Sequence, residues 1–167
     1  MQLRIPGPTP IPPNILQAMS KQMVNHRGKE FVGIIQQVTT RLKEFFQTQN
    51  DVLTLTCSGT GGLEAAIVNT LSPGDRVLAV SNGVFGDRFA EIAGLYGAQV
   101  TRLDFPWGQP ADPDGVRQAL EKDPGIKAVL LTHNETSTGV TSDLATLCAV
   151  VREFDKLILV DAISSLG

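Results

Sequence analysis

The sequence of 167 residues is poor in cysteine, and this shortage argues against the usual metal sites. Its two cysteines, Cys57 and Cys148, belong to no CxxC pair and no Cys/His cluster, so no zinc site is expected. There is also no cysteine set for nickel, iron or an iron–sulfur cluster. Cys57 falls in a strand pattern and Cys148 on the apolar stripe of a helix pattern. We therefore expect both to be small buried residues and not reactive thiols.

Excess charge and long hydrophobic runs are also missing. The formal net charge is -3, which offers no electrostatic footprint for nucleic acid or an anionic membrane. No apolar run is long enough to span a bilayer, and the opening "MQLRIPGPTPIPP" lacks the basic and apolar regions of a signal peptide. We therefore expect a cytoplasmic protein with neither nucleic acid nor membrane as a partner. A hydrophobic content of 42% is typical of a folded globular chain.

The glycine-rich stretch "SGTGGLEAA", residues 58–66, lacks the residues that two common phosphate-binding motifs need. Glu64 stands where the GxGxxG fingerprint requires its third glycine, and Ser81 and Asn82 follow the next strand pattern instead of an acidic residue. No GK[ST] follows, so it is not a P-loop. A nucleotide-binding domain is therefore disfavoured. Two interpretations remain: a turn without a ligand, or an anion site formed by free helix N–H groups and nearby hydroxyls.

What is present is a regular alternation of strand and helix patterns. Apolar runs predict strands at 51–57, 75–81, 98–105, 126–133 and 157–161. Helical spacing of apolar residues predicts helices at 15–23, 31–46, 63–71, 85–97, 113–122 and 142–154. The predicted fold class is α/β, with a mostly parallel sheet covered by helices on both faces. Residues 1–25 form an N-terminal arm with a short helix, and 26–167 form the α/β domain.

Ligands of such sheets bind outside the carboxyl ends of the strands, so the residues that follow each strand are the candidates. Asp161 ends a strongly apolar strand, where ionisation is costly unless a cation is near, although a helix cap is an alternative role. Phe85 follows the second strand of the list and could instead be a core aromatic. The loop "THNETSTGV" is rich in hydroxyls and amides, which also serve turns.

Taken together, these loops supply an anion cradle, an aromatic plate, a hydroxyl donor and a buried carboxylate at one edge of one sheet. A flat, phosphorylated heteroaromatic cofactor with a basic ring nitrogen would use all four. Pyridoxal 5'-phosphate has this description, and a carboxylate partner for its ring nitrogen is a requirement of its chemistry.

Five segments carry a resemblance to a known family, and they occur in family order across almost the whole chain. The segments are "PGPTPIPPNIL", "LTLTCSGTGGLEAAIVNTLSPGD", "SNGVFGDR", "THNETSTGV" and "LVDAISSLG". With them, the chain resembles the N-terminal part of a class V, fold-type I aminotransferase, close to the alanine–glyoxylate and serine–glyoxylate (serine–pyruvate) aminotransferases. The resemblance implies the large domain of the fold-type I PLP transferases in incomplete form.

The resemblance implies a role for each candidate residue. Phe85 would stack on the pyridine ring where some relatives have tryptophan, and Ile163 would pack on the opposite face. Thr136 would reach the phenolic oxygen, and Asp161 would pair with the ring nitrogen. His26 and Arg27 would reach an active site near the homodimer interface of the family, although a solvated helix start is the plainer interpretation. The cofactor phosphate would be held by Ser58, Gly59, Thr60 and Gly61.

The family's Schiff-base lysine lies in a serine–glutamine–lysine type motif, and no lysine of this sequence has that context, including Lys122, Lys127 and Lys156. We therefore expect a partial large domain that lacks the later strands and the small C-terminal domain, and that alone catalyses no transamination. Its strands at 51–57 and 157–161 would be left with unpaired edges. A second copy, or the missing half, would cover those edges.

The expected activity of the full-length protein is transamination between a small amino acid, alanine or serine, and glyoxylate or pyruvate. A cysteine desulfurase-like enzyme is an alternative, although such enzymes usually stack a histidine on the ring where this chain has Phe85. A non-catalytic assembly or interaction module is another. Some close relatives are labelled as soluble hydrogenase subunits, a label that the cysteine content does not support.

Overall fold

The computed structural model describes residue 3 and residues 5–166. The chain divides into two compact units, Met1–Thr54 and Leu55–Leu166. The assignment of residues 26–167 to a single cofactor-binding domain stays a prediction. No helix in the described part of the chain is both long and apolar enough to cross a membrane.

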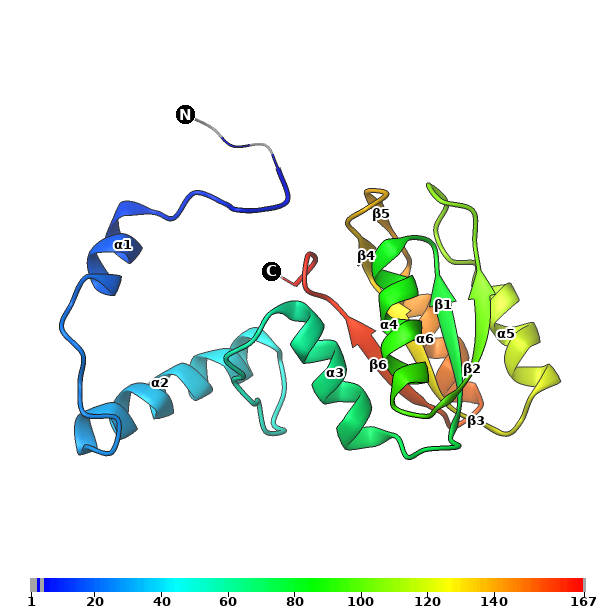
Figure 1. Cartoon of the computed structure of the whole chain (residues 1–167), viewed down its shortest axis with the longest axis horizontal. Helices are drawn as coiled ribbons and strands as arrows, with labels where there is room; N and C mark the ends of the chain where they lie inside the picture. The colour runs from blue at the N-terminus through cyan, green and yellow to red at the C-terminus, as the bar shows by residue number, and fades with distance from the viewer. Residues whose placement is uncertain (1–2, 4, 167) are drawn as a thin grey trace. The chain divides into compact units, whose positions relative to one another are not determined.

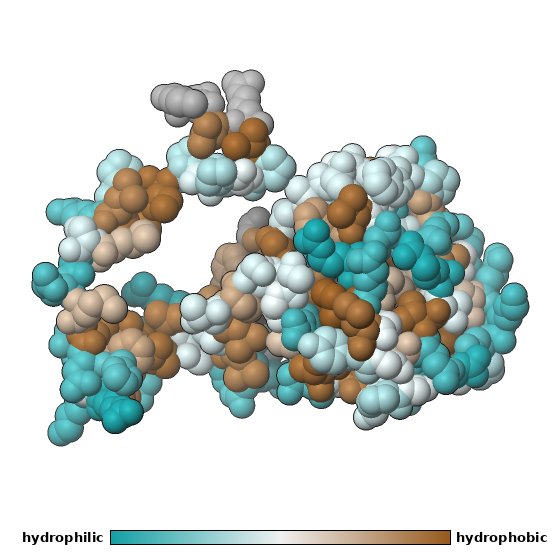
Figure 2. All heavy atoms as spheres, in the orientation of Figure 1, coloured by the Kyte–Doolittle hydropathy of each residue, from teal (hydrophilic) through white to brown (hydrophobic). Residues whose placement is uncertain are grey.

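The first unit contains two helices, α1 (Pro13–Met19) and α2 (Lys29–Phe45). Both were predicted by apolar spacing, and α1 begins at a proline because proline suits the first position of a helix. Neither helix has a buried residue. The apolar stripe that predicted α2, which includes Ile34, Ile35 and Val38, is exposed, and hydrophobic surface is visible on this segment in Figure 2.

The second unit is built on a four-stranded parallel sheet in the order β2-β1-β3-β6. A two-stranded antiparallel hairpin, β4–β5, follows β3. The strands are β1 (Arg76–Ser81), β2 (Gln99–Asp104), β3 (Ile126–Thr132), β4 (Asn134–Glu135), β5 (Val140–Thr141) and β6 (Leu157–Asp161). The helices are α3 (Gly59–Thr70), α4 (Val84–Leu95), α5 (Pro113–Lys122) and α6 (Leu144–Glu153).

Helices cover both faces of this sheet, because successive side chains of each strand point to opposite sides. Val77 and Ala79 of β1 pack into a buried cluster with α3 and α4, whereas Leu78 and Val80 pack into a second cluster with α5 and α6. Figure 1 shows α4 and α6 on opposite sides of the strands. The predicted fold class, a parallel sheet with helices on both faces, is confirmed.

The strand predicted at 51–57 is not formed, and the sheet has four parallel strands instead of five. A strand needs a neighbour for its backbone hydrogen bonds, and no described segment pairs with this one. Leu53 is accordingly 81% exposed. Cys57 is also exposed, so the prediction that it is buried was wrong, while Cys148 is half-buried beside the α5–α6 cluster. Among the described strands, β6 pairs with β3 alone and so forms an edge of the sheet, as expected.

Candidate active site

Polar side chains end three neighbouring strands on the side of the sheet that α3 and α4 cover. Ser81, Thr132 and Asp161 are the last residues of β1, β3 and β6, and all three are buried. Each lies two positions after a residue of the α3–α4 cluster, so each points to the same face. The carboxyl edge of the sheet therefore carries a buried polar rim above the apolar layer.

Asp161 is the acidic member of this rim, with 6% of its surface exposed. Burial raises the pKa of its carboxyl, and the charge of Glu135 raises it further, while a hydrogen bond from the Ile163 N–H (3.0 Å) opposes both. No ion pair involves Asp161 in the part of the chain that the structure describes. Its partner in register, Thr132, has a buried hydroxyl without a hydrogen-bond partner among the same residues. This edge is therefore suited to a cationic, hydrogen-bonding ligand.

The glycines of "SGTGG" form the first turn of α3 and not a loop before it. Gly59 and Gly61 allow close approach: a Cβ on Gly59 would overlap the Ile163 side chain, and one on Gly61 would lie 2.8 Å from the Cβ of Cys57. The Ser58 side chain does not cap the helix. Among the described residues, no acceptor is hydrogen-bonded to the N–H groups of Gly59, Thr60 or Gly61. These donors and the helix dipole favour an anion here.

The neighbouring helix α4 begins differently, because its first N–H groups are already occupied. The Glu135 carboxylate accepts hydrogen bonds from the N–H groups of Phe85 (3.0 Å) and Gly86 (3.1 Å). The Ser137 hydroxyl accepts one from Val84 N–H (3.0 Å). Of these two helix starts, that of α3 is the one left open for an anion.

Two adjoining hollows bring most of the predicted residues together. A small pocket of about 50 Å³ is lined by Phe85, Asn134, Thr136, Asp161, Ile163 and Ser164. A second hollow of about 250 Å³ is lined in part by Gly59 and shares Asp161 and Ile163 with the first. The aspartate and the glycine-rich helix start therefore face a common space. Ser58, Thr60 and Gly61 lie in the same helix start as Gly59. His26 and Arg27 belong to the other unit, and their role stays a prediction.

A hydroxyl network that sequence reasoning did not assign fixes Thr136. Its Oγ1 donates to Ser164 Oγ (2.9 Å), which also accepts from the Asn134 amide (2.9 Å). Ser164 Oγ in turn donates to the Asn134 carbonyl (3.1 Å). This network ties the β4 hairpin, which carries Thr136, to the segment that follows Asp161. Ser164 was within the stretch expected to face the site, but nothing in the sequence gave it a partner.

Arg88, one turn along α4 from Phe85, was also missed. Its guanidinium lies 5.2 Å from the centre of the Phe85 ring, within the range of a cation–π contact. Its Nη1 lies 3.4 Å from Thr60 Oγ1. A positive charge therefore stands between the aromatic residue and the open start of α3. Helical spacing from Phe85 was the signal that could have identified it.

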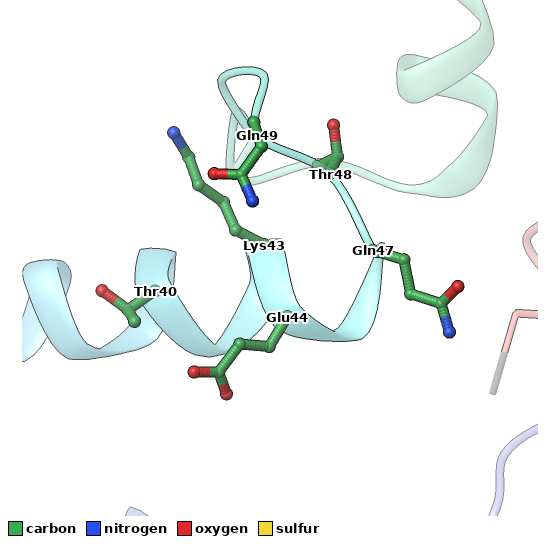
Figure 3. A pocket seen from close by; sticks show the side chains of 6 residues that line it. All are labelled: Thr40, Lys43, Glu44, Gln47, Thr48 and Gln49. Atoms are coloured by element: carbon green, nitrogen blue, oxygen red, sulfur yellow. The ribbon is translucent and has the colours of Figure 1, made fainter.

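A hollow in the first unit, at the end of α2, does not have the character of a site. It is lined by Thr40, Lys43, Glu44, Gln47, Thr48 and Gln49. Figure 3 shows that these side chains diverge, with Glu44 and Gln47 pointing away from Gln49. Lys43 is paired with Asp51 at 3.2 Å.

Comparison with known proteins identifies the family to which this chain belongs. The family model for class-V aminotransferases matches residues 2–167, and the chain belongs to that family. The sequence is 48% identical over 170 residues to a soluble hydrogenase 42 kDa subunit of Anabaena cylindrica. It is 41% identical over 171 residues to an L-aspartate–glyoxylate aminotransferase of Paracoccus denitrificans. The crystal structure of an alanine–glyoxylate aminotransferase from Nostoc sp. superposes with a TM-score of 0.92 at 37% identity.

These matches extend over nearly the whole chain but over less than half of each relative. They cover 100% of this chain and 44% of the Anabaena protein, and 98% of it and 42% of the Paracoccus protein. For the Nostoc structure the shares are 98% and 43%. One of these relatives carries the name of a hydrogenase subunit, whereas the family model that matches this chain is that of the class-V aminotransferases.

Proposed function

We propose that this edge site holds pyridoxal 5'-phosphate and that the whole protein transfers an amino group between a small amino acid and a 2-oxo acid. The single observation that carries the proposal is the common space between Asp161 and Gly59. A buried carboxylate with a raised pKa and an open helix start are the two ends that a ring nitrogen and a phosphate require.

The donor set fits this cofactor. Phosphate would take the N–H groups of Gly59, Thr60 and Gly61, the hydroxyls of Ser58 and Thr60, and the charge of Arg88. The ring would lie between Phe85 and Ile163, both of which line the small pocket. Thr136 lines the same pocket, and its hydroxyl would donate to the phenolic oxygen in place of Ser164 Oγ. Asp161 would accept from the ring nitrogen.

When bound, the cofactor supplies an electron-withdrawing ring that stabilises negative charge at the substrate Cα. The residues of this chain set the conditions for that chemistry. Asp161 would hold a proton at the ring nitrogen, because a buried carboxylate without a cation gains most from a protonated partner. Phe85 and Ile163 would pack on the two faces of the ring and exclude water from them.

We propose further that the lysine which carries the cofactor and moves the Cα proton lies outside residues 1–167. In the second unit, Lys127 is the second residue of β3 and pairs with Asp75, while Lys156 immediately precedes β6 and donates to the Pro124 carbonyl. Both lie at the amino edge of the sheet, whereas Asp161 ends β6 at the carboxyl edge. Residues 1–167 alone would then show no transamination.

The substrates are proposed from the resemblance to the alanine–glyoxylate and serine–glyoxylate (serine–pyruvate) aminotransferases, and the names of two relatives support the part that concerns alanine and glyoxylate. The Nostoc and Paracoccus proteins carry names that pair alanine or aspartate with glyoxylate. We propose alanine or serine as the donor, glyoxylate or pyruvate as the acceptor, and a homodimer as the assembled form. Pairing of residues 1–167 with the remaining half of the protein would complete the sheet beyond β6.

The test is a purified full-length protein assayed with each donor and acceptor. The proposal expects a yellow protein whose visible absorption is abolished by borohydride, and keto-acid product from alanine or serine with glyoxylate. Sulfide release from cysteine without transamination would instead support a desulfurase-like enzyme. A colourless protein that stays colourless with added cofactor would support a non-catalytic assembly module and contradict the proposal.

A further inference from the structure

Glu135 is a fully buried carboxylate that the proposed chemistry does not use. Its exposed fraction is 0%, and no ion pair involves it in the part of the chain that the structure describes. A buried charge without a cation is costly unless hydrogen bonds compensate it. The residues that this carboxylate contacts should therefore explain why a costly buried charge lies beside the proposed site.

Four hydrogen bonds compensate the charge, and two of them reach across the fold. Glu135 Oε2 accepts from Phe85 N–H (3.0 Å) and Gly86 N–H (3.1 Å), 50 and 49 residues away. Glu135 Oε1 accepts from Ser137 N–H (3.1 Å) and the Ser137 hydroxyl (2.6 Å). The carboxylate also lies at the positive end of the α4 dipole, which favours its charge.

The sequence around α4 is shaped to admit this carboxylate. Gly83, the residue before the helix, provides no cap of its own. A Cβ on Gly83 would overlap the Glu135 side chain and come within 2.6 Å of Ser137 Oγ. Glycine is therefore required there for close approach. The helix cap of α4 comes from the hairpin after β3 instead of from the preceding loop.

We propose that Glu135 is a positioning residue, which holds the Phe85 ring at the height and angle that the cofactor ring requires. The inference rests on the proposed function. Phe85 lines the small pocket, and Glu135 binds its backbone N–H. The chain neighbours of Glu135, Asn134 and Thr136, line the same pocket. One carboxylate thus ties the wall that carries Phe85 to the wall that carries Thr136. By occupying the α4 start, it also leaves the α3 start as the place for phosphate.

The test is a double-mutant cycle in the full-length protein, read as the Kd for pyridoxal 5'-phosphate. Glu135→Gln keeps the shape but presents an NH2 group to two of the four donors, and we expect the Kd to rise about tenfold. Phe85→Ala should have an effect of similar size. If Glu135 acts through Phe85, the double variant resembles Phe85→Ala alone. By contrast, the fold-changes in Kd caused by Glu135→Gln and by Thr60→Ala should multiply in the double variant, because Thr60 belongs to the phosphate end of the site.

Two further variants separate positioning from loss of folding. Asp143→Ala removes another acidic helix cap, that of α6, and should lower the melting temperature without changing the Kd. Ser137→Ala removes only the hydroxyl that joins Glu135 to Val84 N–H, and should raise the Kd about threefold. It replaces Glu135→Gln as the test variant if Glu135→Gln does not fold. Hydrogen exchange at the Phe85 and Gly86 amides should accelerate in both site variants and stay unchanged in Asp143→Ala.

The outcomes distinguish this inference from the function on which it rests. A wild-type protein that binds no pyridoxal 5'-phosphate overturns both. A wild type that binds it, with Glu135→Gln and Phe85→Ala effects that multiply, overturns the positioning role alone. Unchanged exchange at the Phe85 amide in the Glu135 variant has the same consequence. If Glu135→Gln raises the Kd when residue 85 is Phe but not in the Phe85→Ala variant, the positioning role is supported.

Discussion

The Ile163 side chain covers Gly59 so closely that a Cβ on residue 59 would overlap it. The nearest atom is Ile163 Cδ1, the far end of a flexible side chain. A clash there is relieved by rotation of Ile163 and not by movement of the backbone. The contact therefore links the phosphate end of the proposed site to the residue expected on one face of the cofactor ring.

This contact predicts that Gly59→Ala weakens cofactor binding more than folding. Ile163 has to leave its place, so we expect the Kd for pyridoxal 5'-phosphate to rise about tenfold while the melting temperature changes little. Fluorescence titration and thermal unfolding of the full-length protein measure the two. Adding Ile163→Val, which removes Cδ1, should recover part of the affinity. Gly94→Ala, in open space near the end of α4, is the control and should leave the Kd unchanged.

The raised pKa of Asp161 predicts that this residue lowers the stability of the cofactor-free protein at neutral pH. At a pH below 3.8, the ordinary pKa of this carboxyl, the group is protonated in both the folded and unfolded states, and its burial does not reduce the stability of the protein. As the pH rises through the higher folded-state pKa, that stability is lost. Asp161→Asn, which can still accept from Ile163 N–H, should therefore unfold at a higher temperature than wild type at pH 7.

The check is a pair of melting curves with cofactor removed, at pH 7 and at pH 4. The difference between wild type and Asp161→Asn should shrink at the lower pH. With cofactor bound, the same variant should lose nearly all transaminase activity, because the ring nitrogen has no carboxylate partner. A wild type more stable than Asp161→Asn at pH 7 without cofactor would contradict the burial argument.

Arg88 provides a prediction about charge. Because its guanidinium lies beside Thr60 and the Phe85 ring, Arg88→Gln should raise the Kd for pyridoxal 5'-phosphate about threefold. Pyridoxal without the phosphate should bind the variant and the wild type equally. The difference should also diminish at high salt, since the charge is exposed. Arg117→Gln, on α5 and paired with Glu153, is the matched control and should change neither Kd.

The proposal that the catalytic lysine lies outside residues 1–167 predicts that this piece alone is inactive. Mixed with alanine and glyoxylate, this piece should form no pyruvate above the rate of free pyridoxal 5'-phosphate. The rate is measured by a coupled dehydrogenase assay, with full-length protein as the reference. Turnover by residues 1–167 at a rate similar to that of the full-length protein would show that a lysine within them suffices.

Sequence reasoning succeeded where the signal was local. Helix α5 begins at Pro113 after the capping residue Asp112 and ends at Lys122, as predicted. The alternation of apolar strands and amphipathic helices also correctly predicted a parallel sheet with helices on both faces. These features depend on periodicity and on side chains that act on their own backbone.

It failed where the answer depended on a distant partner. Residues 51–57 have a strand pattern, but a strand forms only beside another, and Cys57 is exposed for the same reason. Glu135 reads as one polar residue in a polar loop, and its role depends on Phe85 and Gly86, which lie 50 and 49 residues away. The predicted helix began at residue 63, whereas α3 begins at Gly59, and Gly59 and Gly61 serve close packing in its first turn.

The protonation state of the cofactor ring tests the central claim most directly. Full-length protein loaded with pyridoxal 5'-phosphate labelled with ¹⁵N at the ring gives a nitrogen chemical shift that reports whether the ring nitrogen carries a proton. We predict a protonated nitrogen across neutral pH in wild type and an unprotonated one in Asp161→Asn. A ring nitrogen that titrates alike in both proteins would contradict the pairing of Asp161 with the cofactor.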